Sequence, residues 1–141
     1  MDIPTKKILI VEDELPLLNL LFDKFSQIGF QVEKAKDGVE GLMLALKSKP
    51  DIILMDIIMP NMDGLTMLKN LRADPWGKDA DVLILSNKED SESISGGMEG
   101  KVGQFFIKSD WNINDLVEMV KTRLEVTDNL NKNNPETPPT Q

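Results

Sequence analysis

Residues 51–64, DIILMDIIMPNMDG, decide how the rest of the chain is arranged. The run from Ile52 to Met55 is short and apolar, as expected of a central parallel strand that is buried on both faces. It ends at Asp56, where such a strand would emerge into a loop. Pro60 would stop further ladder pairing, and Asp63-Gly64 favours a turn and a helix start. Because open α/β sheets bind ligands at the carboxyl ends of their strands, Asp56 is a candidate functional residue. Taken alone, it could equally cap a loop.

The rest of the chain repeats this pattern of short apolar runs separated by stretches of helical periodicity. Strands are predicted at residues 8–11, 30–35, 82–85 and 105–107, in addition to 52–55. The run at 30–35 alternates between apolar and polar residues, which favours a position near a sheet edge. Strands that alternate with helices predict an α/β fold with a parallel sheet and right-handed crossovers.

Four amphipathic stretches predict the helices. The first has Pro16 in its opening turn and stops at Gly29, and the third runs from Leu65 to the Asp74-Pro75 turn. The second follows Asp37-Gly38, and its predicted inward residues are Val39, Leu42, Ala45 and Leu46. The last follows a cap-like Asn112, and its predicted inward residues are Ile113, Leu116, Val117, Val120 and Leu124. The methionines, among them Met43, Met67 and Met119, are interpreted as core filler.

A further helix would belong in residues 87–104, but Gly96, Gly97, Gly100 and Gly103 weaken that prediction. Each interior glycine costs about 1 kcal/mol relative to alanine, so we expect this helix to be short, frayed or mobile. The segment 127–141 has little to bury and is predicted to be a disordered tail or the start of a linker. Residues 1–126 are then one domain.

Composition excludes several classes of function. The 141 residues carry 16 basic and 24 acidic side chains, a net charge of −8, which disfavours direct binding of nucleic acid. Cysteine and histidine are absent, so the chain has no disulfide, thiolate metal site, imidazole base or phosphohistidine. No apolar run is long enough for a membrane span, and the start of the chain does not resemble a signal peptide. We expect a cytoplasmic protein without membrane contacts.

Four of the five predicted strands lead into polar residues that are candidates for a site. The first leads into Glu12-Asp13, the third ends at Asp56, the fourth at Ser86 and the fifth at Lys108. Because the carboxyl ends of parallel strands meet at one edge, three acids, a hydroxyl and an ammonium group should converge there. Each residue alone has an ordinary explanation, such as a helix cap or a surface lysine. The combination carries the functional prediction.

Acids gathered in this way repel one another, and two charges about 4 Å apart cost about 4 kcal/mol at an effective dielectric constant of 20. Either some of them take up a proton or a cation binds among them. An oxygen-only cluster suits a hard cation, Mg²⁺ before Ca²⁺. A metal beside a carboxylate, a lysine and a hydroxyl suits phosphoryl transfer, with an acyl phosphate on Asp56 as its product.

The motifs VEDE at 11–14, MDIIMPNMDG at 55–64, the isolated Ser86 and FFIK at 105–108 resemble the receiver domain of two-component response regulators, in particular the stand-alone, CheY-like type. The resemblance covers residues 6–126 and implies a flavodoxin-like (βα)5 doubly wound sheet of strand order 2-1-3-4-5. It implies that Asp56 is the phosphoacceptor. Asp13, Asp56, Glu12 through water and the backbone carbonyl of Ile58 would hold Mg²⁺. Ser86 and Lys108 would assist the chemistry, and Ser86 and Phe105 would be the switch pair.

The sequence also departs from the family pattern. Ser109 follows Lys108 where relatives have proline, which favours a trans peptide. Asn87 replaces a small residue, Lys101 stands where relatives often have glycine, and the switch aromatic is Phe105 instead of tyrosine. These differences concern the switching step more than the phosphorylation chemistry.

We therefore predict a module that accepts a phosphoryl group from a histidine kinase or a histidine phosphotransfer protein. It would signal to an unknown downstream protein through the face of the helix expected in residues 87–104, the strand at 105–107 and the last helix, as a monomer or a weak, conditional dimer. It would catalyse only its own phosphorylation and a slow autodephosphorylation. The alternatives are a degenerate receiver that never switches, an aspartate-dependent phosphatase of the haloacid dehalogenase type and a flavin-binding flavodoxin-like protein. Ile58 lies where that phosphatase needs a second acid, and Glu12-Asp13-Glu14 would repel a flavin phosphate.

Overall fold

The fold is a five-stranded parallel sheet, seen in a computed structural model that describes residues 5–86, 104–107 and 112–132. The strand order is β2-β1-β3-β4-β5, as the resemblance implies. The strands are β1 (Lys7–Val11), β2 (Gln31–Ala35), β3 (Ile52–Asp56), β4 (Val82–Ser86) and β5 (Gln104–Ile107). The helices are α1 (Leu15–Ile28), α2 (Gly38–Ser48), α3 (Gly64–Arg72) and α5 (Ile113–Lys132), with a short 3-10 turn at Gly77–Asp79.

The register of the sheet aligns the strand ends that the sequence singles out. Val11 pairs with Met55, Asp56 with Leu85 and Ser86 with Ile107. The residues that follow β1, β3 and β4 therefore leave the sheet at the same edge. β2, whose sequence alternates between apolar and polar residues, lies at a lateral edge of the sheet, as predicted. β5 lies at the other lateral edge.

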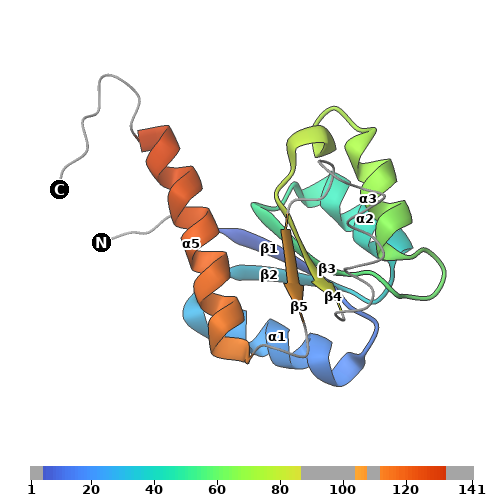
Figure 1. Cartoon of the computed structure of the whole chain (residues 1–141), viewed down its shortest axis with the longest axis horizontal. Coiled ribbons are helices and arrows are strands. Elements are labelled where there is room, and N and C mark those ends of the chain that lie inside the picture. The colour runs from blue at the N-terminus through green and yellow to red at the C-terminus, as the bar shows by residue number, and fades with distance from the viewer. Residues whose placement is uncertain (1–4, 87–103, 108–111, 133–141) are drawn as a thin grey trace. The chain divides into compact units, whose positions relative to one another are not determined.

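Helices cover both faces of the sheet (Figure 1), with α2 and α3 on one side and α1 on the other. The α2–α3 side is filled by the fully buried Leu9, Ile53, Ala45, Met67 and Leu68, together with neighbouring apolar residues. On the other side, α1 buries Leu18, Leu21 and Phe25. The helix begins with a proline in its first turn and ends at Gly29, whose φ of 121° is a conformation that favours glycine.

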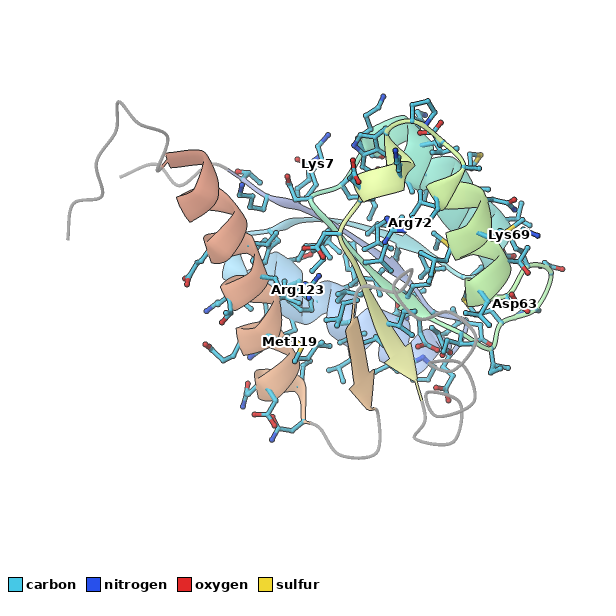
Figure 2. The ribbon with its side chains drawn as sticks, turned by 45° about the horizontal axis from the view of Figure 1, so that its top comes forward. Lys7, Asp63, Lys69, Arg72, Met119 and Arg123 are labelled. Atoms are coloured by element: carbon cyan, nitrogen blue, oxygen red, sulfur yellow. The ribbon has the colours of Figure 1, made fainter. Side chains whose placement is uncertain are left out.

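A guanidinium group closes the connection from α3 to β4. Arg72 donates from Nη1 to the carbonyl oxygens of Gly77 at 2.9 Å and Ala80 at 2.8 Å. Figure 2 labels this side chain on α3, at the other end of the helix from Asp63. The Gly77 carbonyl also accepts the Ala80 N–H at 3.3 Å, so the guanidinium adds a second bond there and ties α3 to the loop that leads to β4.

The prediction of which α2 residues face inward is partly wrong. Val39 is 52% exposed and Met43, one turn later, is 59% exposed, whereas Gly38, Gly41 and Ala45 are buried. The reason is the close approach of the helix to the sheet, because a Cβ on Gly41 would lie 2.9 Å from the Val11 side chain. Met67 is fully buried, so the core role predicted for methionine holds there and fails for Met43.

The C-terminal helix α5 is a separate compact unit in the structure. Asn112 Oδ1 accepts the Asp115 N–H at 3.0 Å, which confirms the predicted cap. Leu116, Val117, Val120 and Leu124 are buried, as predicted, and Ile113 is partly exposed. The helix continues to Lys132, so the prediction of disorder from Thr127 is wrong for residues 127–132. Backbone hydrogen bonding can continue a helix through a polar sequence, which composition alone does not reveal.

The predictions for a helix in residues 87–104 and for the remainder of the tail concern residues outside the described part of the chain. No helix within that part combines the length and the apolar character that crossing a bilayer requires.

Candidate metal centre at the carboxyl edge of the sheet

Glu12 is the first acid after β1 and is fully buried. Its backbone N–H donates to the carbonyl of Ala35 at 3.0 Å, which extends the pairing with β2 by one residue. Its side-chain Oε2 accepts the N–H of Glu14 at 3.0 Å. This bond turns the carboxyl group back toward the loop, so an ionisable group is held inside the protein at the end of an apolar strand.

Asp56 ends β3 and is 8% exposed. Its Oδ1 accepts the N–H of the next residue, Ile57, at 2.7 Å. That short bond fixes the rotation of the carboxylate, because donor and acceptor are adjacent in the chain. The strand pairing to β1 and β4 fixes the backbone beneath it.

Oxygen atoms of Glu12, Asp13 and Asp56 lie within 4.8 Å of one another, and Asp13 is the member that reaches solvent. The convergence predicted from the strand ends is thus observed for all three acids. Three carboxylates at this spacing, without nitrogen or sulfur donors, form a set that suits a hard divalent cation. The burial of Glu12 and Asp56 makes mutual repulsion costly, and a bound cation would remove that cost.

The loop 57–63 closes tightly behind Asp56. The N–H of Gly64 donates to the Ile57 carbonyl at 2.7 Å, and a Cβ on Gly64 would lie 2.2 Å from the Asp56 carbonyl oxygen. Glycine is therefore required where α3 begins against the end of β3. Within this loop Ile58 is 62% exposed, so an apolar side chain stands in solvent beside the acids.

Asp37 is a further buried acid, and its role was missed by the sequence prediction, which treated Asp37-Gly38 only as a turn. Its Oδ1 accepts the Glu40 N–H at 2.9 Å and its Oδ2 accepts Asn61 Nδ2 at 2.7 Å. Both bonds favour the ionised form and lower the pKa of Asp37 below its ordinary 3.8, the Glu40 bond most. Its contribution to stability is therefore complete at neutral pH and is lost only when the pH falls through the lowered pKa.

The described residues test the remaining site predictions only in part. Ser86 ends β4 and Phe105 lies in β5, as predicted, and the Ser86–Ile107 pairing brings the ends of these strands together. The side chains of Ser86 and Phe105, and all of Lys108 and Ser109, lie outside the described part. The roles of these residues and of the Ile58 carbonyl stay predictions.

Replacing Asp13 with asparagine should stabilise the protein in the absence of divalent cations. The change removes one charge from three that repel, and because Asp13 reaches solvent we expect a gain of about 1 kcal/mol in the free energy of unfolding. Added Mg²⁺ should raise the unfolding midpoint of the wild-type protein and have a much smaller effect on Asp13→Asn. Urea denaturation with and without Mg²⁺ measures both. A destabilised variant in the absence of Mg²⁺ would show that repulsion does not dominate here.

Comparison with known proteins agrees with the fold. Residues 8–121 match the family described as response regulator receiver domain. The Regulator of RpoS from Escherichia coli (strain K12) is 37% identical over 115 residues, which cover 82% of this chain and 34% of that protein. The structure of response regulator protein TrrA from Thermotoga maritima, in complex with Mg(2+)-BeF, has 28% identity and a TM-score of 0.71, covering 84% of this chain and 98% of that chain.

A second curated relative, the DNA-binding dual master transcriptional regulator RpaA from Synechocystis sp., is 27% identical over 124 residues, or 88% of this chain and 51% of the relative. The chain thus spans about half the length of the first curated relatives or less. The family match extends over most of the sequence and over all the described strands apart from Lys7 at the start of β1. The chain belongs to the receiver domain family of the response regulators of two-component systems.

Proposed function

We propose that Asp56 accepts a phosphoryl group in a Mg²⁺-dependent reaction, and that the donor is a histidine kinase or a histidine phosphotransfer protein. The observation that carries the proposal is the cluster of Glu12, Asp13 and Asp56 at the carboxyl edge of the sheet. The Mg(2+)-BeF complex of the similar TrrA receiver supports it. These 141 residues contain no histidine, so the donor group lies outside them.

In the transfer step, a carboxylate oxygen of Asp56 forms a bond to phosphorus while the bond from phosphorus to the donor nitrogen breaks. The electron pair leaves with that histidine nitrogen, which takes up a proton, and Asp56 becomes an acyl phosphate. Mg²⁺, held by Asp13 and Asp56 directly and by Glu12 through water, would supply charge neutralisation for the phosphoryl oxygens. The Ile57 amide holds the nucleophile in a fixed orientation, which lowers the entropic cost of attack.

Lys108 and Ser86 complete the proposed chemistry. As an ammonium and a hydroxyl at the ends of neighbouring strands, they would bind phosphoryl oxygens, and the new charge would draw the Ser86 loop toward the site. Phe105 would report that movement to the surface. The output would be a contact of the helix predicted within residues 87–104, of β5 and of α5 with a downstream protein.

Intact-mass measurement with acetyl phosphate tests the proposal directly. The protein should gain the mass of one phosphoryl group when Mg²⁺ is present and no mass when the metal is chelated. Beryllofluoride should bind under the same metal requirement. Mg²⁺ binding without any mass gain or beryllofluoride response would favour the degenerate receiver, which keeps the fold but does not switch.

The phosphatase alternative is disfavoured by Ile58. That reaction needs a second acid two residues after the nucleophile, and here an exposed isoleucine occupies the position. A flavin site is disfavoured because the acids after β1 would repel its phosphate.

We expect the phosphorylated form to be long-lived, because Ile58 has no polar atom in its side chain with which to orient an attacking water. Lys88 is the second residue that we predict to flank the phosphoryl group. Replacing Ile58 with asparagine should shorten the lifetime several-fold without changing the fold, since the side chain is exposed. The lifetime is measured from the decay of the phosphorylated mass after acetyl phosphate is removed. The prediction would be contradicted if the wild-type phosphoryl group lasted only seconds and if substitutions at Ile58 and at Lys88 both failed to lengthen that lifetime.

A further inference from the structure

The carboxylate of Asp37 connects the start of α2 to the loop 57–63, although it lies outside the acid cluster. The side chain is 7% exposed. One oxygen accepts the Glu40 N–H and closes the first turn of α2, while the other accepts the side-chain amide of Asn61. A serine would suffice for the first bond. The second bond needs the reach and the two oxygens of an aspartate.

The loop residues on the far side of this bond need that support. Asn61 has a φ of 68°, in the left-handed region that residues with a Cβ seldom occupy and asparagine tolerates best. The next residue, Met62, accepts the Gly38 N–H at its carbonyl oxygen at 2.9 Å. A Cβ on Gly38 would lie 2.3 Å from that oxygen, so only glycine allows the approach. A side-chain bond and a main-chain bond thus hold the loop to α2 together.

We propose that Asp37 is a positioning residue for the metal centre, acting through Asn61 and Met62 on the loop that carries the Ile58 carbonyl. It sets the affinity for Mg²⁺ without being a ligand. The inference rests on the proposed function, because it concerns the affinity of the same centre. The physical reason is that Asp56 is held by its own strand, whereas the Ile58 carbonyl lies in a loop. Among the restraints on that loop, the bonds to Asp37 and Gly38 are the ones that tie it to α2.

Two variants remove the bond between the side chains with little other change. Asp37→Ser keeps a cap for α2 and loses the reach to Asn61. Asn61→Gly loses the amide and accepts the left-handed backbone without strain. Each should raise the dissociation constant for Mg²⁺ about 10-fold, as is common when a residue that orients a metal ligand is lost. Mg²⁺ titrations followed by ¹H–¹⁵N NMR suit such weak binding.

The double variant Asp37→Ser/Asn61→Gly should bind Mg²⁺ no more weakly than either single variant, because both remove the same bond. At saturating Mg²⁺, the rate of modification by acetyl phosphate should return to within about twofold of wild type, since the metal then holds the loop. The matched control is Asp74→Ser. Asp74 accepts the N–H groups of Trp76 and Gly77 in the loop that leads to β4, away from the acid cluster. The Asp74→Ser variant should lose stability with no change in its affinity for Mg²⁺.

The outcomes separate this inference from the function on which it rests. Wild-type protein that does not bind Mg²⁺ removes the proposed function and the inference together. Wild-type binding with an unchanged dissociation constant in Asn61→Gly overturns the inference alone, and so do additive losses in the double variant. Asn61 is exposed, so its variant gives an answer even if Asp37→Ser does not fold.

Discussion

The substitution Asp56→Asn should abolish phosphoryl uptake from acetyl phosphate and leave the protein folded. An asparagine keeps an oxygen that can accept the Ile57 N–H, so the local geometry of the strand end is preserved. It lacks the nucleophilic carboxylate, and no acyl phosphate can form at position 56. We expect the modified fraction to fall below detection in intact-mass spectra recorded at a phosphodonor concentration that modifies most of the wild-type protein.

The same variant should be more stable than wild type in the absence of Mg²⁺, because one of three crowded charges is gone. Asp51→Asn is the matched control, since Asp51 immediately precedes β3 at its other end and accepts the Lys7 N–H at 2.7 Å. It should be modified at the wild-type rate. Persistent modification of Asp56→Asn, with the new mass on Asp13 or elsewhere, would show that the phosphoacceptor is wrongly assigned.

Gly64→Ala should damage stability and metal binding together. The added Cβ would lie 2.2 Å from the Asp56 carbonyl oxygen and 2.9 Å from the Ile57 Cα. Both obstacles are backbone atoms that rotamer changes cannot move, so α3 or the end of β3 must shift. Such overpacking costs about 3 kcal/mol, of which the better helix propensity of alanine would return about 1 kcal/mol. A net loss of about 2 kcal/mol should appear in urea denaturation, with weaker Mg²⁺ binding because Asp56 is displaced.

Gly29→Ala provides the contrast. A Cβ there would meet no heavy atom within 4 Å, and the only penalty comes from its φ of 121°. We expect a loss of about 1 kcal/mol and unchanged Mg²⁺ affinity. If Gly64→Ala lost stability and still bound Mg²⁺ as the wild type does, the contact between the start of α3 and Asp56 would not position the metal centre.

Much of the fold could be predicted because each buried strand has a continuous apolar sequence that ends in a polar residue. The rule that parallel strands present their carboxyl ends at one edge then placed Glu12, Asp13 and Asp56 together, and the structure confirms that placement. The same rule placed Ser86 at the end of β4, which the register bears out for its backbone.

The errors arise where contacts between elements override local pattern. Apolar content indicated that Val39 faces inward, but the inner face of α2 is made of residues too small to show in a hydrophobicity pattern, such as Gly41. The hydrogen bond between Asn61 and Asp37 joins residues 24 positions apart, so no local sequence motif predicts it. The carbonyl bonds of Arg72 likewise depend on how a loop folds back after α3.

The pairing of Val11 with Met55 has a consequence that extends beyond the core. Side chains alternate between the two faces of a strand, so slipping β3 by a single position would send each of its apolar side chains to the opposite, differently packed face and carry Asp56 away from Glu12. Such a slip is strongly penalised by the apolar side chains of β3, all of which are fully buried. Close packing of uncharged side chains inside the sheet therefore fixes the register of β3, and that register determines how far Asp56 lies from Glu12.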